Sequence, residues 1–379
     1  MEQIDIWTLD RVNIKLNSIF LDELNHKLFL KFKTKEGAYN QIFKNNNIPF
    51  STFKNVLKKS HMKDFFVPLE IYIKISEILN IPKNLLQSNI ISYKTAGGTN
   101  YVESPILPIK ITPVFDMLFA HHIGDGTVIN CGKGRLPYFG YRQFNEFYRI
   151  QYIRKIENIF GKIKFVEDYF VNSTRPYCPP VLSSLFFKYY GLKVDNFLSE
   201  KARIPQIIFD KGKESLLAVM FAFIIDEGNI DSTQIVINLK NKLLIEDLNK
   251  ICLILGYKSK VTSNIREIEY ARLNILREGM KKLYQDYLIL HKKYPIIDLG
   301  KKGDKIESSF KIYNREIYKK EGNRDVILEI LKKEQLSVNQ LAERLNMTRQ
   351  GVRYHIHNLL KRRKIRIIDD AQLNWVYGA

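Results

Sequence analysis

Two carboxylate–glycine steps carry the residue types that could do chemistry in this sequence. Asp125 precedes Gly126 at the end of MLFAHHIGDG, and Glu227 precedes Gly228 at the end of MFAFIIDEG. In both places a largely apolar stretch, typical of a buried helix, stops at the acid. A glycine there can adopt the left-handed conformation that ends a helix, which puts each carboxylate beside the negative end of a helix dipole. We therefore expect a hard divalent cation, Mg²⁺ or another such as Mn²⁺, to compensate the charge.

The same acids indicate phosphodiester chemistry. Two such helices packed side by side would bring their carboxylates together at one end, where they could hold a metal beside a backbone phosphate. Asp226 stands next to Glu227, and the sequence leaves open which of the two faces the metal. Asp125, Asp226 and Glu227 are therefore the candidate metal ligands.

Close packing of the two helices needs small residues on their shared face. Ala120 and Gly124 in the first motif and Ala222 in the second supply them at helical spacing. His121 and His122 stand where aliphatic side chains would be simpler, and we expect them to serve packing or capping in preference to metal ligation.

Each acid belongs to one copy of an internal repeat, predicted to span 113–205 and 206–310. After the acid–glycine step come strand-like stretches, LPYFGYRQF and STQIVINLK. An amphipathic helix closed by glycine follows, EFYRIQYIRKIENIFG or KLLIEDLNKICLILG, and then a further strand, KIKFV or YKSKVTS. The recurring order predicts two α/β halves that contribute one acid each.

The segments before the repeat differ from it in character. Residues 1–95 are predicted to be helical, and the polar turn NNNIPFS suggests a helix-turn-helix, although a plain helical bundle fits equally well. The stretch 96–112 contains Gly97-Gly98 and prolines, so we expect an extended linker.

The final segment, 322–379, is predicted to be a winged helix-turn-helix. Ser337 and Thr348 can cap its second and third helices. The outer face of the third helix would contact phosphates and base edges through Arg349, Gln350, Arg353, Tyr354 and His357. A module for protein contacts is the alternative, and the basic character of this face favours nucleic acid.

Composition limits the partners and the compartment. The 379 residues have 45% apolar content, a formal charge of +20 and a pI near 9.6, which indicates a folded protein that attracts polyanions. A basic protein without a nucleic-acid role is the alternative on charge alone. Three scattered cysteines argue against a disulfide scaffold or a zinc site and fit a reducing cytoplasm. No apolar run predicts a signal peptide or a membrane span.

The motif pair resembles the two LAGLIDADG motifs of monomeric homing endonucleases. Aligned on the final glycine, the copies read LFAHHIGDG and MFAFIIDEG. The resemblance covers about residues 105–300. It includes the stretch RIPQIIFDKGKES, which is similar to the family's connection between the two halves. It implies an α+β fold of duplicated αββαββα halves forming a saddle over DNA, flanked here by the two helix-turn-helix-like segments. It also implies that the catalytic acids are Asp125 and Glu227.

Members of that family often carry a basic or polar residue near each metal site, at a strand end. The matching positions are Arg142 and Gln143 in the first copy and Lys240 in the second. We predict a catalytic role for Lys240, with a solvated strand-end lysine as the alternative.

The resemblance implies a cytoplasmic, monomeric endonuclease that cuts double-stranded DNA with divalent metal. Two alternatives stay open. The same fold occurs in DNA-binding transcription regulators that have lost cleavage, and an RNA-processing or RNA-binding protein would have the same basic character.

Overall fold

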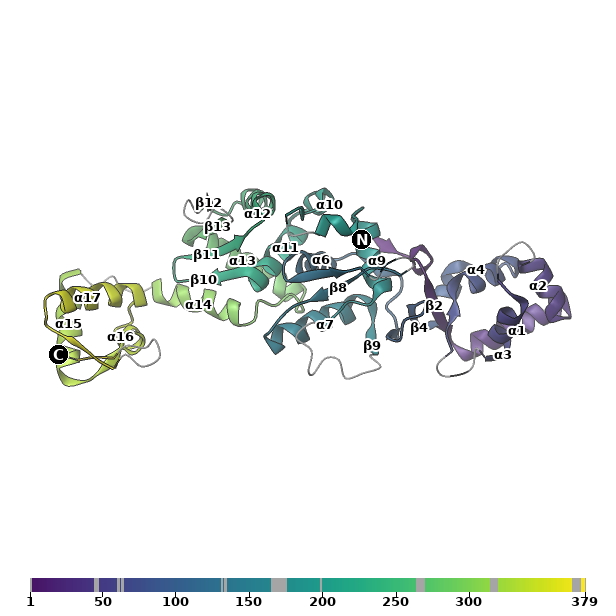
Figure 1. The fold of residues 1–379 in the computed structure, drawn as a ribbon, viewed down its shortest axis with the longest axis horizontal. Coiled ribbons are helices and arrows are strands. Elements are labelled where there is room, and N and C mark those ends of the chain that lie inside the picture. The colour runs from purple at the N-terminus through teal and green to yellow at the C-terminus, as the bar shows by residue number, and fades with distance from the viewer. Residues whose placement is uncertain are drawn as a thin grey trace.

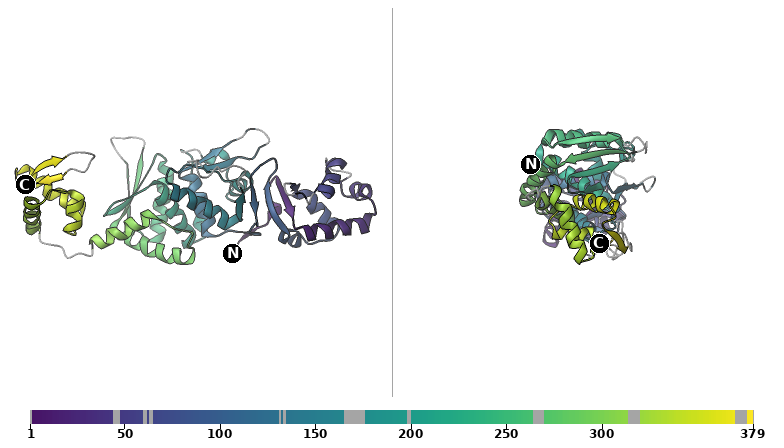
Figure 2. Two further views of the ribbon diagram at one scale, coloured as in Figure 1. Left: turned by 90° about the horizontal axis from the view of Figure 1, so that it is seen from below. Right: turned by 90° about the vertical axis from the view of Figure 1, so that its left-hand side faces the viewer.

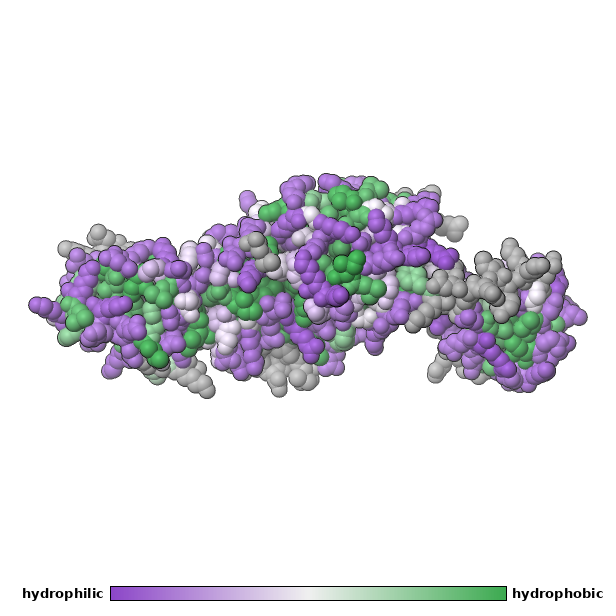
Figure 3. All heavy atoms as spheres, turned by 180° about the vertical axis from the view of Figure 1, so that it is seen from behind, coloured by the Kyte–Doolittle hydropathy of each residue, from purple (hydrophilic) through white to green (hydrophobic). Residues whose placement is uncertain are grey.

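A computed structural model describes residues 2–43, 48–59, 62, 65–130, 132, 135–164, 176–197, 200–263, 270–313, 320–369 and 376–378. The molecule is elongated, with N-terminal helices at one end, a mixed helix–sheet body in the middle and the C-terminal module at the other end (Figure 1). The α+β class is as predicted. Hydrophilic residues cover most of the face in Figure 3. Among the described residues, no helix has both the length and the apolar character to cross a membrane.

The N-terminal region contains strands as well as the expected helices. Its elements are β1 (Gln3–Ile4), the 3-10 helix η1 (Ile6–Thr8), β2 (Val12–Leu16), α1 (Ser18–Phe32), α2 (Lys35–Phe43), α3 (Phe50–Lys59), β3 (Val67–Pro68), α4 (Leu69–Ile78), α5 (Lys83–Ser88) and β4 (Ile90–Thr95). The alternation of buried and half-buried residues along β2 is the pattern of a strand with one face on a core.

The stretch expected to be a linker forms part of a sheet. It contains β5 (Tyr101–Glu103) and β6 (Ile109–Lys110). The sheet order is β3-β2-β4-β5-β9, so β5 lies between β4 and β9 (Lys162–Lys164) of the first repeat. β6 pairs with β1. The segment is extended, as its prolines indicate, but strand pairing fixes it to both neighbours.

The two repeats follow the predicted order of elements. The first contains α6 (Pro113–Ile123), β7 (Gly126–Ile129), β8 (Tyr138–Tyr141), α7 (Glu146–Phe160), β9, α9 (Pro180–Tyr189) and η2 (Val194–Phe197). The second contains α10 (Gln206–Asp210), α11 (Lys213–Glu227), β10 (Gly228–Ile230), β11 (Gln234–Leu239), α12 (Lys242–Leu255), β12 (Ser259–Ser263), β13 (Ala271–Leu276), α13 (Arg277–Lys293) and α14 (Lys301–Tyr313).

The repeats differ in how their last strand pairs. In the second repeat all four strands form one sheet, in the order β10-β11-β13-β12. In the first, β7 and β8 form a separate pair, and β9 joins the N-terminal sheet instead. Seen from below, the β12–β13 hairpin rises on one side of the body while α13 and α14 lie along the other (Figure 2).

The motif helices α6 and α11 pack against each other at the centre of the main hydrophobic core. Both are apolar on nearly every side, which is typical of helices without a solvent face. Ala120 and Ala222 are fully buried. A Cβ added at Gly124 would lie 2.7 Å from Oδ2 of Asp226, so the absence of a side chain permits the close approach.

The C-terminal module has a separate core and the predicted winged-helix order. It contains α15 (Lys320–Lys333), β14 (Leu336–Ser337), α16 (Val338–Arg344), α17 (Arg349–Lys361), β15 (Arg366–Asp369) and β16 (Val376–Gly378). Both predicted caps are confirmed. Ser337 forms a capping box with Gln340, and the Thr348 side chain accepts a hydrogen bond from the Gly351 amide.

Candidate active site

Each candidate acid lies at the end of a motif helix and precedes a glycine that begins a strand; Glu227 is the last residue of α11, and Asp125 follows α6 after Gly124. A Cβ at Gly126 would lie 2.0 Å from the carbonyl oxygen of His122, and one at Gly228 would lie 2.5 Å from that of Ile224. Neither glycine has a positive φ, so the expected left-handed helix end is wrong. The chain passes from α11 directly into β10, and from α6 into β7 after the turn Gly124–Asp125. Glycine is required in both places because the strand begins against the helix backbone.

Asp226 points into the interface between the motif helices. Its side chain is fully buried, and its Oδ2 lies 3.0 Å from Nδ1 of His121. The Tyr141 hydroxyl donates to its Oδ1 at 2.7 Å. Burial raises the pKa of Asp226 to about 7, although the hydrogen bond from Tyr141 lowers it. Burial also holds the pKa of His121 well below its usual range. Both carboxylate oxygens of Asp226 are therefore engaged within the protein.

Asp125 is half-buried beside the other two carboxylates. Burial, followed by the charges of Asp226 and Glu227, raises the pKa of Asp125 to about 8. The Gln143 side-chain amide donates to its Oδ2 at 3.2 Å, and its backbone carbonyl accepts from the amide of Arg142 at 2.9 Å. Repulsion between neighbouring carboxylates is the situation that a bound cation relieves.

Glu227 is half-buried as well, and burial and the charge of Asp226 raise its pKa. One carboxylate from each repeat thus reaches the place where α6 and α11 end. Within the described ranges, no three or more His, Cys, Asp or Glu side chains are grouped as a metal site.

Lys302 places a cation beside these acids. Its Nζ donates to the carbonyl oxygen of Ile224 at 2.7 Å and also to that of Ile225, so it caps the C-terminal end of α11. Burial lowers the pKa of Lys302, and the three carboxylates raise it in turn. Sequence reasoning missed this residue because it lies in the charged stretch KKGDKIESS, which has the composition of a solvated segment.

The sequence-predicted residues at the strand ends differ in their surroundings. Arg142 is exposed, and its charge lowers the pKa of Asp125. Lys240 is exposed just beyond β11, with its Nζ 5.6 Å from the ring centre of Tyr270. The strand pairing shows which residues of the two repeats correspond. Gly126 of β7 pairs with Tyr141 of β8, and Gly228 of β10 pairs with Ile237 of β11. Counted from these pairs, Asn238 and Leu239 occupy the places that Arg142 and Gln143 hold in the first repeat.

One face of the second-repeat sheet carries polar and basic side chains. Asn238 pairs with Arg272, which pairs with Thr262, and directly paired residues share a face. The Arg272 guanidinium donates to Oδ1 of Asn238 at 2.8 Å. The alternate positions, including Ile237 and Leu273, are fully buried against the helices. The outer face therefore presents hydrogen-bonding groups in a regular array.

The third helix of the C-terminal module, α17, has the predicted orientation. Val352, Ile356 and Leu359 are buried in the local core. The residues predicted to contact nucleic acid are all exposed on the opposite face; they are Arg349, Gln350, Arg353, Tyr354 and His357.

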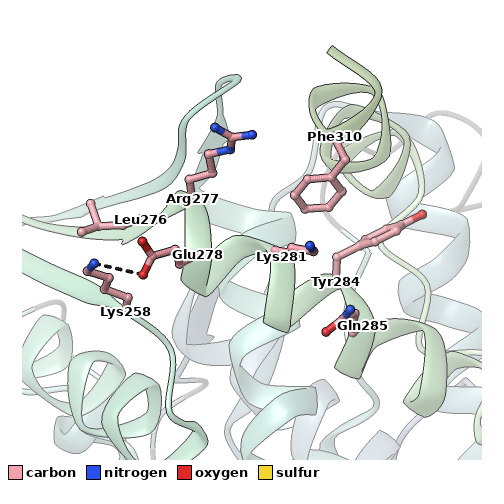
Figure 4. Close-up of a pocket in the computed structure, with 8 residues that line it drawn as sticks. All are labelled: Lys258, Leu276, Arg277, Glu278, Lys281, Tyr284, Gln285 and Phe310. Atoms are coloured by element: carbon pink, nitrogen blue, oxygen red, sulfur yellow. Dashed lines mark hydrogen bonds and ion pairs between the residues drawn. The ribbon is translucent and has the colours of Figure 1, made fainter. Parts of the chain in front are cut away.

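A cavity of about 530 Å³ lies elsewhere, at the start of α13 (Figure 4). Its lining contains basic and aromatic side chains, and Lys258 and Glu278 form an ion pair of 3.0 Å across one edge. Neither candidate acid lines it. The acids stand instead on the surface where α6 and α11 end.

Comparison with known proteins identifies one part of the chain. Residues 323–366 match the family model described as winged helix-turn-helix DNA-binding. The C-terminal module is therefore a winged helix-turn-helix. No curated protein matches the chain.

Several solved structures show partial similarity. A mesophilic variant of the homing endonuclease I-DmoI aligns at TM-score 0.33 and 18% identity, covering 45% of this chain and 93% of that one. I-DmoI in complex with DNA and Mn aligns at TM-score 0.29 and 20% identity, with the same coverage. Full-length DUF199/WhiA from Thermatoga maritima aligns at TM-score 0.32 and 12% identity, covering 66% and 90%. Such low scores do not establish a shared fold, so the site is interpreted from its own geometry.

Proposed function

We propose that the protein is a sequence-specific double-stranded DNA endonuclease of the LAGLIDADG type, acting as a monomer. The observation that carries the proposal is the convergence of Asp125 and Glu227, one from each repeat, at the ends of two packed helices. The C-terminal winged helix-turn-helix and the charge of +20 support DNA as the partner.

Asp125 and Glu227 would hold a divalent cation, Mg²⁺ or Mn²⁺. The donors fit, because carboxylate oxygens are the ligands of hard cations and these two repel each other without one. When bound, the cation would polarise a phosphate oxygen and activate water. We infer that Glu227 is the ligand in preference to Asp226, because Asp226 is fully buried with His121 and Tyr141.

The surrounding residues would orient the two acids. Gln143 holds the carboxylate of Asp125 through its side-chain amide. Lys302 caps α11 and reduces the repulsion among the acids. Lys240, at the end of β11, would supply a second cation near the phosphate in the other half.

The array on the second-repeat sheet and the exposed face of α17 would bind the duplex. Arg272 and Asn238 on the sheet and Arg353 on α17 have the hydrogen-bonding groups that read base edges or contact phosphates. Arg142, exposed next to Asp125, would contact a phosphate close to the cut.

A selection experiment tests the proposal. The full-length protein is incubated with a randomised duplex library, with and without Mg²⁺, and both bound and cut molecules are sequenced. Cuts at one motif, appearing only with Mg²⁺, are expected. No enrichment of duplex DNA, with retention of structured RNA in a competition at fixed salt, would contradict the proposal and favour an RNA partner.

A DNA-binding regulator without cleavage is the second candidate. The winged helix-turn-helix favours it, because this module can bind an operator while the repeats serve as a platform. Enrichment of a motif with a sharp footprint that is independent of metal, and with no strand scission, would support this candidate.

A further inference from the structure

Phe144 is an exposed aromatic side chain next to the candidate acids. It is 71% exposed, in the loop between β8 and α7. The preceding residue, Gln143, donates a hydrogen bond to the carboxylate of Asp125. Singly exposed apolar side chains are common, so the neighbours of this ring, and not its exposure alone, give it meaning.

The loop that carries Phe144 is held in place. One guanidinium nitrogen of Arg149, on α7, donates to the carbonyl oxygen of Gln143 at 3.0 Å and to that of Phe144 at 2.7 Å. The Asn145 side chain caps the start of α7 by accepting from the amide of Phe147. The ring is therefore presented by a backbone with several fixed hydrogen bonds, which reduces the entropy lost when it binds.

The Arg142 side chain packs against the Phe144 ring. The guanidinium carbon of Arg142 is 5.2 Å from the centre of the Phe144 ring, within cation–π range. Arg142 is exposed as well. An aromatic ring with an arginine beside it can contact a base and the adjacent phosphate of one nucleotide at the same time.

We propose that Phe144 inserts its ring against the bases that flank the phosphate bound beside Asp125 and partly unstacks one base step there. The inference rests on the proposed function and adds to it a residue that positions the DNA at the cut. Apolar side chains that enter a base step deform the duplex, and the cost of unstacking is recovered through the additional contacts. Nucleic acid is favoured over a protein partner because Arg142 packs on the ring and the neighbouring Gln143 contacts the candidate catalytic acid Asp125.

The test uses the full-length protein and the duplex recovered by the selection described above. 2-Aminopurine, whose fluorescence rises when it is unstacked, replaces bases at successive positions of the bound motif. The variants are Phe144→Ala, which removes the ring, and Phe144→Trp, which enlarges it. Phe29→Ala is the matched control, because Phe29 on α1 is 66% exposed and lies in the N-terminal region.

The wild-type protein and Phe144→Trp are expected to raise the fluorescence at one base step. Phe144→Ala should lose that signal and bind about 5- to 150-fold more weakly, the effect of removing one stacked aromatic. Phe29→Ala should change neither quantity. Thermal denaturation, unchanged in all three variants, would exclude loss of folding.

The inference and the proposed function can fail separately. A fluorescence rise and an affinity that both persist in Phe144→Ala would overturn the inference and leave DNA binding intact. The absence of any rise with the wild-type protein would do the same. Failure of the wild-type protein to bind any duplex would overturn both.

Discussion

Nδ1 of His121 lies 3.0 Å from Oδ2 of Asp226, across the interface between α6 and α11. Both side chains are almost fully buried, so this polar contact joins the two repeats inside the core. Asp125 and Glu227 lie only a few residues further along the same backbones. The contact therefore fixes the relative position of the two helix ends that carry the candidate acids.

Replacing Asp226 by alanine should destabilise the core. His121 and Tyr141 would each lose a buried hydrogen-bonding partner, which costs about 1–3 kcal/mol. The free energy of unfolding, measured in urea, is the test. Asp304→Ala, at an exposed position on α14, is the control and should have little effect. Equal stability of the two variants would show that the buried contact does not hold the helices.

Gly124→Ala should also weaken the interface between the motif helices. The added Cβ would lie 2.7 Å from Oδ2 of Asp226, and overpacking of this kind costs about 1–3 kcal/mol. Gly322→Ala, on α15, meets no atom within 4 Å and should leave stability unchanged or slightly raise it. Differential scanning calorimetry of both variants would check this, and a melting temperature unchanged in Gly124→Ala would argue against close packing.

His122 should contribute less to the stability of the core in acid than at neutral pH. Burial holds the pKa of His122 well below the ordinary value of 6.5, so below that value only the unfolded chain gains the proton. The contribution of His122 to stability should therefore rise with pH up to about 6.5, by at most about 1.4 kcal/mol per pH unit. The raised pKa values of Asp125, Asp226 and Glu227 contribute with the opposite sign, so the contribution of His122 is read from the difference between two proteins.

The measurement compares urea denaturation of the wild-type protein with that of His122→Gln on both sides of pH 6.5. The variant lacks the titrating group, so the slope of its stability against pH below 6.5 should be lower than that of the wild-type protein by up to about 1.4 kcal/mol per pH unit. Parallel curves for the two proteins would mean that His122 is accessible to protons in the folded state.

Lys302→Met should shift the acid side of the pH–rate profile of metal-dependent cutting to higher pH. Lys302 lowers the pKa of Asp125 and of Glu227, so its removal raises both, and cutting requires the ionised carboxylates. Initial rates as a function of pH up to and beyond about 8, the pKa of Asp125 without a cation, are the measurement. Lys240→Met is the comparison, and a larger shift in Lys240→Met than in Lys302→Met would assign the supporting cation to the strand end.

Arg353→Ala should weaken DNA binding and its dependence on salt. Loss of one phosphate contact lowers the slope of log affinity against log salt by about 0.9. Lys333→Ala, at an exposed position on α15, is the control. An unchanged slope in Arg353→Ala would mean that Arg353 makes no phosphate contact.

The repeat and its acids could be predicted from sequence because local signals encode them. Apolar helices that stop at Asp125-Gly126 and Glu227-Gly228 are visible in the residues themselves, as are the caps Ser337 and Thr348. The reason for each glycine could not be predicted, because it depends on the approach of a strand to the helix that precedes it.

Long-range pairings could not be predicted. β5, in the expected linker, pairs with the preceding strand β4 and with β9, which lies far along the sequence in the first repeat. Lys302 reaches the acids because α14 packs against β10 and α13, and no local pattern distinguishes it from the surrounding lysines.

Cleavage by Asp125→Asn and by Glu227→Gln tests the central claim most directly. Both substitutions keep the size of the side chain and remove the charge that would hold the cation. Each variant should lose Mg²⁺-dependent cutting of the selected duplex while it binds that duplex with the affinity of the wild-type protein. Cutting at the wild-type rate by either variant would contradict the assignment of these two residues as the catalytic acids.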